Sequence, residues 1–370
     1  MFNSTFLLTW HEKQWIEVLD EFNIKDPHYL PAYLRLFESE ADRTVHTHFG
    51  GNGMLFVYGD SRNHVIYPFF KRSISDIPLL GNSAAGLFDI VSPYGYGGPL
   101  AQVEDESISE ELWKGFFSSF DVFCRDSNIV SEFCRLHPMF ENHIPISKFS
   151  KGTIQRKGRV LYVNLDRSEE EIIAGMGKLH RRDARRASRD PSLAFYIDNE
   201  KKFIGDFFNL YTETMVRHEA HRCYMFSLDF FKRACQLLGD HLTLSSVTHD
   251  GMVVSGLLSI RYGDLLYHWL AGGKREYFHL NTQNLLYYES ILQAHREGYK
   301  YCIEGGGVSA EEDSVFKFKE GFSRQSKDFY VYKRIHLQEE YDKLVKLQRT
   351  GVNSGEDFFP WYRVSELVGV

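Results

Sequence analysis

Two copies of the same order of predicted elements run through the chain, and this repeat limits the fold more than any other feature of the sequence. The dipeptides Gly59-Asp60 and Gly263-Asp264, which favour tight turns between antiparallel strands, lie 204 residues apart. Each occupies the same place in a series of helix, helix, strand meander, helix and strand. We therefore expect an internal duplication: an α/β (α+β) fold of two modules, each a mixed, mostly antiparallel sheet flanked by helices. The hairpins fit this arrangement better than a parallel doubly wound sheet.

Hydrophobic periodicity and turn residues place the elements of both copies. The first copy predicts strands near 6–10, 45–48, 54–58, 64–70, 88–91 and 130–136, and helices near 13–22, 29–39 and 110–124. The second predicts strands near 159–165, 242–248, 252–262, 265–271, 299–304 and 329–335, and helices near 202–217, 228–238, 283–297 and, in the tail, 338–347. One long helix is expected after Ser168, which with the acids that follow favours a helix start. The polar segment 147–159 separates the copies.

Composition limits the class of protein. Apolar residues make up 43% and charged residues 25% of the chain, as in ordinary globular proteins. The net charge of −7 gives the chain as a whole no electrostatic reason to coat nucleic acid or anionic lipid, so any basic site must be local. Five scattered cysteines without a CxxC pair, no leader-like N-terminus and no apolar run of about 18 residues predict a protein of the reducing cytoplasm.

Several enzyme classes lack their motifs in this sequence. HExxH, GxSxG, a Walker loop and a clean GxGxxG are absent. Cys134 with His137, and the group of His218, His221 and Cys223, show only part of a metal-ligand pattern. We therefore assign no metal.

A glycine-rich loop, Ser92-Pro-Tyr-Gly-Tyr-Gly-Gly-Pro99, is the first candidate for ligand binding. Its glycines allow close backbone approach, while Tyr94 and Tyr96 offer rings and hydroxyl groups. With Asp89 just before it, the loop suits a sugar or a peptide. The alternative is a turn at a sheet edge whose tyrosines pack for stability.

Two basic features lie in the second copy. Lysine and arginine recur every three or four residues after Ser168, at Lys178, Arg181, Arg182, Arg185, Arg186 and Arg189. Such a run suits phosphates of a nucleotide, lipid pyrophosphate, coenzyme A or tRNA, or is simply a solvated helix face. Further on, Arg217 near Tyr224 either clamps a phosphate or carboxylate, or caps helix carbonyls.

The most informative pattern follows the predicted strand at 299–304. Glu304 precedes three consecutive glycines, Gly305 to Gly307, and Asp313 precedes a stretch in which Lys319 stands between Phe318 and Phe322. Glycines after a buried strand allow ligand contact, and a held ammonium stabilises developing negative charge. Acyl transfer to an amine has this need, because its tetrahedral intermediate is an oxyanion. The alternative is a surface lysine lying over aromatic rings.

These motifs together resemble a known family. Asp89 to Pro99, the stretch Thr214-Met215-x-Arg217 to Phe226, and Gly305 to Gly307 through Phe318-Lys319-x-Gly321-Phe322 look like the FemABX-related branch of the GNAT superfamily. The resemblance covers most of residues 1–340. It implies two GNAT-like modules, 1–152 completed by 326–370, and 153–325 carrying the acyl-transfer site.

The resemblance also implies an activity. Members transfer an acyl group to an amine, from aminoacyl-tRNA in the peptidoglycan-bridge enzymes or, in many relatives, from acyl-coenzyme A to amino sugars. Lys319 matches the family lysine that assists the transferring carbonyl. The sequence departs from the pattern at Gly272 to Asn284, which lacks the GNAT pyrophosphate loop Q/R-x-x-G-x-G/A, and no long helical arm of the kind found in some aminoacyl-tRNA users is visible. The donor therefore stays open.

We predict a cytoplasmic N-acyltransferase that acts on an amine of a cell-envelope precursor, with no tightly bound cofactor and with acyl-coenzyme A or aminoacyl-tRNA as co-substrate. A transient contact with a membrane surface is allowed, and DNA is not expected as a partner. The rival is a non-catalytic module of the same fold that binds a glycan or nucleotide sugar. The catalytic candidates are Lys319, Asp313 and Glu304. The substrate-binding candidates are Asp89, Ser92, Tyr94, Tyr96, Gly97, Arg217, Tyr224, Gly305, Gly306 and Gly307. The candidates for donor phosphate are Arg182, Arg186, Asn281, Thr282 and Asn284, the last three because a helix N-terminus offers free amides.

Overall fold

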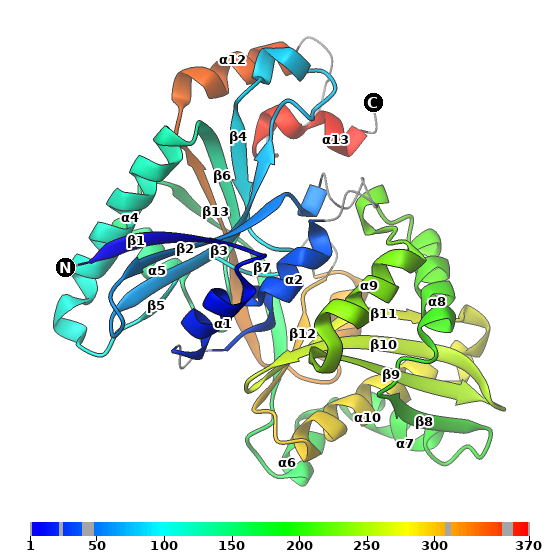
Figure 1. Ribbon diagram of the computed structural model, residues 1–370. Coiled ribbons are helices and arrows are strands. Elements are labelled where there is room, and N and C mark those ends of the chain that lie inside the picture. The colour runs from blue at the N-terminus through cyan, green and yellow to red at the C-terminus, as the bar shows by residue number, and fades with distance from the viewer. Residues whose placement is uncertain (1, 22–24, 39–47, 308–311, 350–357, 369–370) are drawn as a thin grey trace. The chain divides into compact units, whose positions relative to one another are not determined.

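A computed structural model describes residues 2–21, 25–38, 48–307, 312–349 and 358–368 of the chain (Figure 1). The chain divides into two compact units. The first unit consists of 1–23, 28–156 and 329–370, and the second of 24–27 and 157–328. Within the described residues, no helix combines the length and the apolar content that crossing a bilayer requires.

The sheet of the first unit contains mostly antiparallel strands. Its order is β1 (Asn3–Leu8), β2 (Asn52–Gly59), β3 (His64–Ser73), β4 (Phe88–Val91), β6 (Ile129–Arg135) and β13 (Ser326–Ile335), with the short β5 (Leu100–Gln102) beside β3. The pair of β4 and β6 is parallel, and the other pairs are antiparallel.

Helices complete the first unit. They are α1 (Glu12–Asp20), α2 (Pro31–Phe37), α4 (Ser109–Asp126), α5 (His143–Phe149), α12 (Gln338–Arg349) and α13 (Ser365–Val368). The amphipathic α4 buries Phe116 and Phe120 against Phe56 and Tyr67 of the sheet, with ring centroids 5.2 to 5.6 Å apart. Burying several aromatic rings together is a large source of stability, so this layer forms the core of the unit.

The second unit has a sheet of the same kind. Its order is β8 (Leu193–Asp198), β9 (Leu242–His249), β10 (Met252–Tyr262), β11 (Leu265–Gly273), β12 (Tyr301–Gly305) and β7 (Thr153–Asn164). Its helices are α6 (Glu169–Gly175), α7 (Lys178–Ala187), α8 (Ile204–Arg217), α9 (Leu228–Leu238), α10 (Thr282–Arg296) and α11 (Ser314–Glu320). Figure 1 shows α8 and α9 on one face of this sheet and α10 with α7 on the other.

The two units repeat one topology, which confirms the expected fold class. In each sheet an antiparallel meander is followed by a helix and by a strand that pairs in parallel with the last strand of the meander: α4 and β6 beside β4, then α10 and β12 beside β11. A further antiparallel strand borders this parallel pair in each unit, β13 in the first and β7 in the second. The boundaries of the two modules, 1–152 with 326–370 and 153–325, stay a prediction.

The prediction of one long helix after Ser168 is wrong. Ser168 forms the expected capping box with Glu171, but α6 ends at Gly175 and α7 begins at Lys178. Met176 between them is buried and extended, and the amide of Gly177 donates to the carbonyl of Gly321 at 2.8 Å. Tertiary contacts of this two-residue break therefore override the local helical pattern.

Other differences concern short elements. The sequence did not predict β5, β8, α5, α11 or α13, each of which has seven residues or fewer. Residues 45–47 of the expected strand 45–48, and the ends of the helices expected at 13–22 and 29–39, lie outside the described residues. His48 is helical. The remaining long helices and strands lie where the periodicity placed them.

Candidate functional site

In the second unit, the parallel pairing of β11 and β12 is short. It runs only from Leu265 beside Tyr301 to Tyr267 beside Ile303, although β11 continues to Gly273. The carboxyl half of β11 therefore has no parallel partner strand among the described residues. Ligands of α/β proteins commonly bind at the carboxyl ends of parallel strands, where backbone groups are not used by the sheet.

The equivalent strands of the first unit stay paired for longer. After β4 and β6 have paired from Phe88 to Val91, the amide of Ser92 donates to the carbonyl of Phe133 at 3.1 Å. The amide of Gly97 then donates to the carbonyl of Arg135 at 2.8 Å. In the first unit these bonds continue the contact with β6 beyond the end of β4, whereas the carboxyl half of β11 has no parallel neighbour among the described residues. The second unit is therefore the better candidate for a donor site.

A buried polar network lies where β11 and β12 separate. His268 Nδ1 is 3.0 Å from Glu304 Oε2, and His268 Nε2 is 3.0 Å from Ser290 Oγ of α10. Both side chains of the His268–Glu304 pair are almost fully buried. Cys302 Sγ lies 3.5 Å from His268 Nε2. This buried polar network is surrounded by apolar side chains, and each of its hydrogen bonds offsets the cost of burying polar atoms.

His268, Cys302 and Glu304 are also close enough to share a metal ion, because their ligand atoms lie within 4.8 Å of one another. However, both ring nitrogens of His268 already have partners, one on Glu304 and the other on Ser290. Burial, reinforced by Glu304, raises the pKa of the Cys302 thiol well above its usual value, whereas a metal needs the thiolate. The arrangement fits a hydrogen-bonded network better than a metal site.

Lys319 lies close to this network. Its Nζ donates to the carbonyl of Gly306 at 2.9 Å, and the side chain is half-buried on α11. Burial lowers the pKa of Lys319, while the carboxylates of Glu304 and Asp313 raise it, and the net shift is downward. An ammonium has three hydrogens to donate, and no described residue other than Gly306 accepts one. The lysine can therefore offer hydrogen bonds to a ligand.

The other two catalytic candidates occupy different environments. Glu304 has no exposed surface and is bound to His268. The carboxylate of Asp313 caps α11 by accepting from the amide of Phe316 at 2.9 Å. Gly305 has a φ of 81°, which favours glycine over other residues at the end of β12.

Arg217 and the start of α10 lie at the far end of β11. Arg217 donates to the carbonyl of Gly273 at 3.3 Å and to Thr214 Oγ1 at 3.2 Å, and its guanidinium lies over the ring of Phe278. Gln283 of α10 donates to the carbonyl of Gly272 at 3.3 Å. The structure thus brings Arg217 and the N-terminus of α10 to the same two glycines. Arg217 is also paired with Glu213 at 3.5 Å, and its role in binding phosphate stays a prediction.

The polar residues that begin α10 differ in their access. Asn281 adopts the left-handed conformation, with φ 59°. Thr282 is fully buried and accepts a hydrogen bond from Ser255 at 2.9 Å, so its hydroxyl faces the interior. Asn284 is half-buried. The first amides of a helix have no preceding turn to donate to, so any phosphate contact here would come from backbone N–H groups. Tyr224 lies in a 3₁₀ turn, and its carbonyl accepts from Tyr211.

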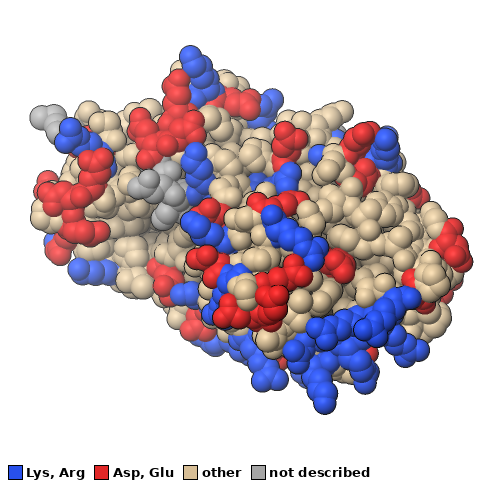
Figure 2. Space-filling view, turned by 90° about the horizontal axis from the view of Figure 1, so that it is seen from below, with Lys and Arg blue, Asp and Glu red and all other residues tan. Residues whose placement is uncertain are grey.

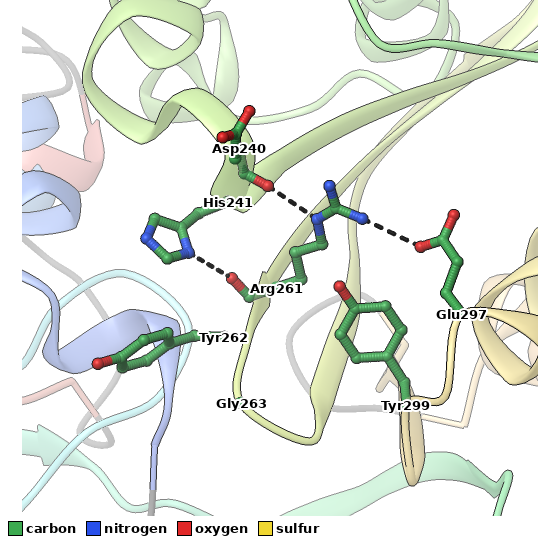
Figure 3. A pocket seen from close by; sticks show the side chains of 7 residues that line it. All are labelled: Asp240, His241, Arg261, Tyr262, Gly263, Glu297 and Tyr299. Atoms are coloured by element: carbon green, nitrogen blue, oxygen red, sulfur yellow. Dashed lines mark hydrogen bonds and ion pairs between the residues drawn. The ribbon is translucent and has the colours of Figure 1, made fainter. Parts of the chain in front are cut away.

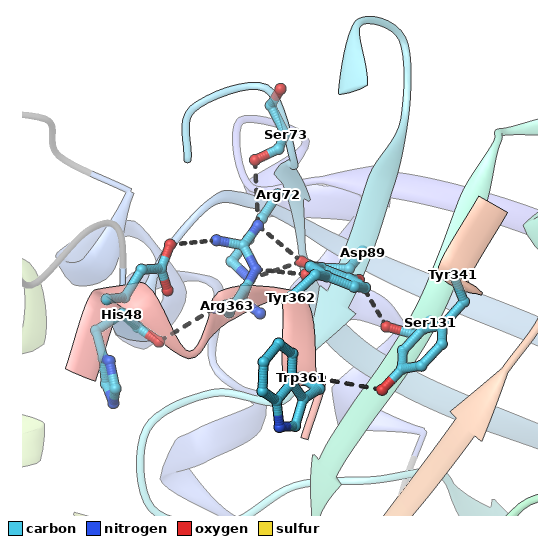
Figure 4. A network of polar contacts seen from close by, with 10 residues as sticks. His48, Arg72, Ser73, Asp89, Ser131, Tyr341, Trp361, Tyr362 and Arg363 are labelled. Carbon is cyan, nitrogen blue, oxygen red and sulfur yellow. Dashed lines mark hydrogen bonds and ion pairs between the residues drawn. The ribbon is translucent and has the colours of Figure 1, made fainter. Parts of the chain in front are cut away.

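Asp89, which precedes the glycine-rich loop, belongs to a buried polar network of the first unit (Figure 4). Asp89 is completely buried and accepts hydrogen bonds from Arg72 at 2.8 Å, from Tyr362 at 3.1 Å and from Arg363. Burial raises the pKa of Asp89, but the charges of Arg363 and Arg72 lower it by more, so the net shift of the pKa is downward. The prediction that Asp89 lines an acceptor site is not supported, because its carboxylate is enclosed by these ion pairs.

Ser92 and Gly97 are buried as well, so a direct substrate contact through either is not supported. Ser92 Oγ accepts from the amide of Arg135, which ties the loop to β6. The rings of Tyr94 and Tyr96 are half-buried. Tyr94 lies against Phe49, with centroids 4.6 Å apart. In this loop Tyr94, Gly95 and Tyr96 keep exposed surface, and the two tyrosines stay the predicted contacts for an acceptor.

The arginines of α7 lie on the outside of the second unit. Arg182 and Arg186 are exposed, and Arg182 donates to the neighbouring Asp183 at 2.9 Å. Ala184 and Ala187 on the opposite face are buried in a core that also contains residues of α10. The predicted role of the arginines in holding donor phosphate stays a prediction.

Sequence reasoning missed the partners that complete both buried networks. His268 and Ser290 were not singled out, nor were Arg72 and Arg363. One signal was available for the first: His268 interrupts an apolar strand, Leu265-Leu-Tyr-His-Trp-Leu, that is otherwise without a charge. Arg72 and Arg363 are far apart in the chain, and no local pattern links them.

A separate pocket of about 470 Å³ lies at the other end of β11 (Figure 3). It is lined by Asp240, His241, Arg261, Tyr262, Gly263, Glu297 and Tyr299. Arg261 donates to the carbonyl of Asp240 at 2.8 Å and to Glu297 at 3.0 Å, so its charge is already paired. None of the residues predicted from the sequence lines this pocket.

Comparisons with known proteins identify a domain in the second unit and the fold of the chain. Residues 178–317 match the family model described as "Acetyltransferase (GNAT) domain". No curated protein matches the sequence. Among solved structures, FemX is similar with a TM-score of 0.65 and 11% identity over 92% of this chain and 99% of that chain. The C-terminal domain of a putative lysylphosphatidylglycerol synthetase from Agrobacterium fabrum is similar with a TM-score of 0.55 and 10% identity, over 91% of this chain and 95% of that one.

A protein of unknown function from Bacteroides thetaiotaomicron has a TM-score of 0.53 at 11% identity, with coverage of 90% and 99%. At such identities the likenesses show the fold alone. The second unit carries a GNAT acetyltransferase domain, and the chain as a whole has a FemX-like fold, which confirms the expected resemblance.

Proposed function

We propose that the protein is an N-acyltransferase that moves an acyl or aminoacyl group from an activated donor to an amine of a cell-envelope precursor, either an amino sugar or a peptidoglycan or nucleotide-sugar intermediate. The family match in the second unit and the likeness to FemX support the reaction type. One observation carries the proposal: the half-buried ammonium of Lys319 is held by the Gly306 carbonyl next to the point where β11 and β12 separate.

Acyl transfer makes a specific demand on the site. An amine attacks the carbonyl carbon of the donor, and the carbonyl oxygen becomes an oxyanion before the leaving group departs. The Gly306 carbonyl fixes the direction of Lys319 by accepting one of its hydrogens. Another hydrogen is then available to the oxyanion. Glu304 and Asp313 favour the charged form of the lysine, which is the form that this role needs.

The attacking amine must also lose a proton. Glu304 is the stronger of the two candidate acceptors, because it is linked to the imidazole of His268 and from there to Ser290. Its carboxylate has no exposed surface, so the proton would have to reach it through a neighbouring group of this network. Asp313 already uses its carboxylate to cap α11. A proton delivered to the His268–Glu304 pair would be shared between two basic groups in a region from which water is excluded.

Both donors remain open, and both molecules carry phosphate groups that the site would have to bind. Acyl-coenzyme A is the usual donor of GNAT domains, and its pyrophosphate would suit the N-terminal amides of α10 beside Arg217. Aminoacyl-tRNA is the other candidate. Tyr94 and Tyr96, whose rings keep some exposed surface, stay the proposed contacts for the acceptor.

Activity assays of Lys319→Ala test the proposal. Purified protein would be incubated with radiolabelled acetyl-coenzyme A or charged tRNA, and with a UDP-linked amino sugar or a muramyl peptide as acceptor. Loss of a donor to an oxyanion lowers kcat by about 10²–10³, so this loss is expected for Lys319→Ala. Lys317→Ala is the matched control, because Lys317 is an exposed lysine of the same helix. Full turnover by Lys319→Ala would refute the mechanism, and binding without turnover in the wild type would favour the binding module.

A further inference from the structure

Helix α7 presents one strongly basic face. Its lysine and arginine positions are Lys178, Arg181, Arg182, Arg185, Arg186 and, just beyond its last turn, Arg189. At 100° per residue these positions occupy an arc of about 140° of the helix circumference. Ala184 and Ala187 lie on the opposite side and are buried. The helix is thus held to the unit by small apolar residues and turns its charge outward.

The charge on this face is largely uncompensated. Five of the six basic side chains are exposed, and Arg181 is half-buried. Within the described part of the chain, these six side chains form a single ion pair, between Arg182 and Asp183. Figure 2, which views the molecule from below Figure 1, shows lysine and arginine side chains gathered into a single band on the side where α7 lies. In a chain of net charge −7, such a concentration indicates an anionic partner.

An apolar side chain borders the basic face. Leu179 is 54% exposed and lies about 60° around the helix from Arg182 and about 20° from Arg186. An exposed leucine makes no favourable contact with water or with a sugar-phosphate backbone. The apolar face of α7, with Ala184 and Ala187, packs on the core of the unit, so Leu179 is the apolar side chain of this helix that could enter a lipid interface beside the basic residues.

We infer that α7 docks the protein on the surface of a membrane rich in anionic lipids, with its arginines on the headgroup phosphates and Leu179 entering the interface. The outward-facing charge suits an anionic surface, and Leu179 favours lipid over RNA, whose phosphates would match the arginines but not the leucine. This inference goes beyond the proposed function and does not depend on it.

The docking helix touches the element that bears Lys319. His180, on the inner side of α7, packs its ring against Phe318 and Phe322, with centroids 5.5 and 4.9 Å apart. Gly177 at the start of α7 bonds to Gly321. A membrane bound to α7 would therefore lie on the same unit as the candidate lysine, as an enzyme with a lipid-linked acceptor would need.

Vesicle co-sedimentation of the full-length protein tests this inference. Binding would be compared on vesicles of phosphatidylcholine alone and of phosphatidylcholine with about a third phosphatidylglycerol. We expect binding to the anionic vesicles only, weakening as salt rises. In the triple variant R182Q/R185Q/R186Q the partition coefficient should fall about 100-fold, since each basic residue near an anionic surface contributes a factor of about five.

Two further variants make the test specific. K114Q/K202Q/K343Q removes the same charge from lysines that are 63 to 68% exposed elsewhere, and it should bind as the wild type does. Leu179→Asn should weaken vesicle binding several-fold but leave binding to bulk tRNA unchanged. Equal vesicle binding by the wild type and the triple variant, or by the wild type and Leu179→Asn, would overturn the inference. Binding to tRNA without binding to vesicles would assign the face to RNA instead.

Discussion

Replacing Asp89 by asparagine is expected to lower the unfolding free energy of the first unit by about 3–5 kcal/mol. The carboxylate has no exposed surface and accepts hydrogen bonds from the guanidinium groups of Arg72 and Arg363 and from Tyr362 (Figure 4). An asparagine leaves two buried cations with no charge at that position, and its amide NH₂ would point donors at donors. Breaking a buried ion pair from one side typically has a cost of this size.

The pH dependence of this cost has a definite sign. Burial raises the pKa of Asp89, but Arg363 and Arg72 lower it more, so the folded-state pKa lies below that of the unfolded chain. The stability that the ionised group contributes is therefore complete above the unfolded-state pKa of about 3.9 and is lost as pH falls through the folded-state value. The difference between wild type and Asp89→Asn should be constant near neutral pH and shrink in acid.

Thermal and chemical denaturation would measure the effect. For a unit of this size the expected loss corresponds to a decrease in Tm of about 6–20 °C. Hydrogen exchange should show reduced protection at residues 361–363, because Arg363 joins that segment to Asp89. Glu340→Gln is the control: its partner Lys343 is 63% exposed, so the expected cost is about 0–1 kcal/mol. A loss below about 1 kcal/mol for Asp89→Asn would refute the view that this network holds the C-terminal segment.

The remaining predictions concern the second unit. Gly272→Ala should destabilise by about 1–3 kcal/mol in denaturant titration, because its Cβ would stand 2.6 Å from backbone atoms of α8, whereas Gly175→Ala, with nothing within 4 Å, should change stability by about 0.5 kcal/mol or less. Ser168→Ala should cost about 1 kcal/mol by removing the capping box of α6, and a neutral result would contradict that role. The pH–rate profile should fall on its alkaline side below the usual lysine pKa, because burial lowers the pKa of Lys319 and only its ammonium stabilises an oxyanion. An alkaline limit that persists in Lys319→Ala would exclude this lysine as its origin.

The long elements were readable from the sequence because their signals are local. Helix α4 shows an apolar stripe of 3.6-residue period, and the Gly263-Asp264 turn joins β10 to β11 at the predicted place. Short elements such as β8 and α11 carry too few residues for a period to show. The break between α6 and α7 depends on the contact of Gly177 with Gly321, which no local pattern encodes.

The candidate site shows the same division. The sequence marked Lys319 and the glycines after Glu304, because consecutive glycines and a lysine between aromatic residues are unusual in themselves. It also marked Asp89, but burial gave that carboxylate a structural role with Arg72 and Arg363. A sequence shows which residues carry charge, whereas access to water depends on what packs over them.

The sequence by itself therefore predicted the duplicated α/β fold and the basic residues of α7, since both follow from periodicity and spacing along the chain. The likeness to acyltransferases came from motifs that resemble those of a known family. The tertiary structure decided which duplicated strand pair separates early, which carboxylates are enclosed, and which partners face Lys319. Those properties depend on residues such as His268 and Glu304, or Asp89 and Arg363, that meet only after folding. Pairing energies and pKa values arise from these contacts between distant residues, so they belong to the folded chain.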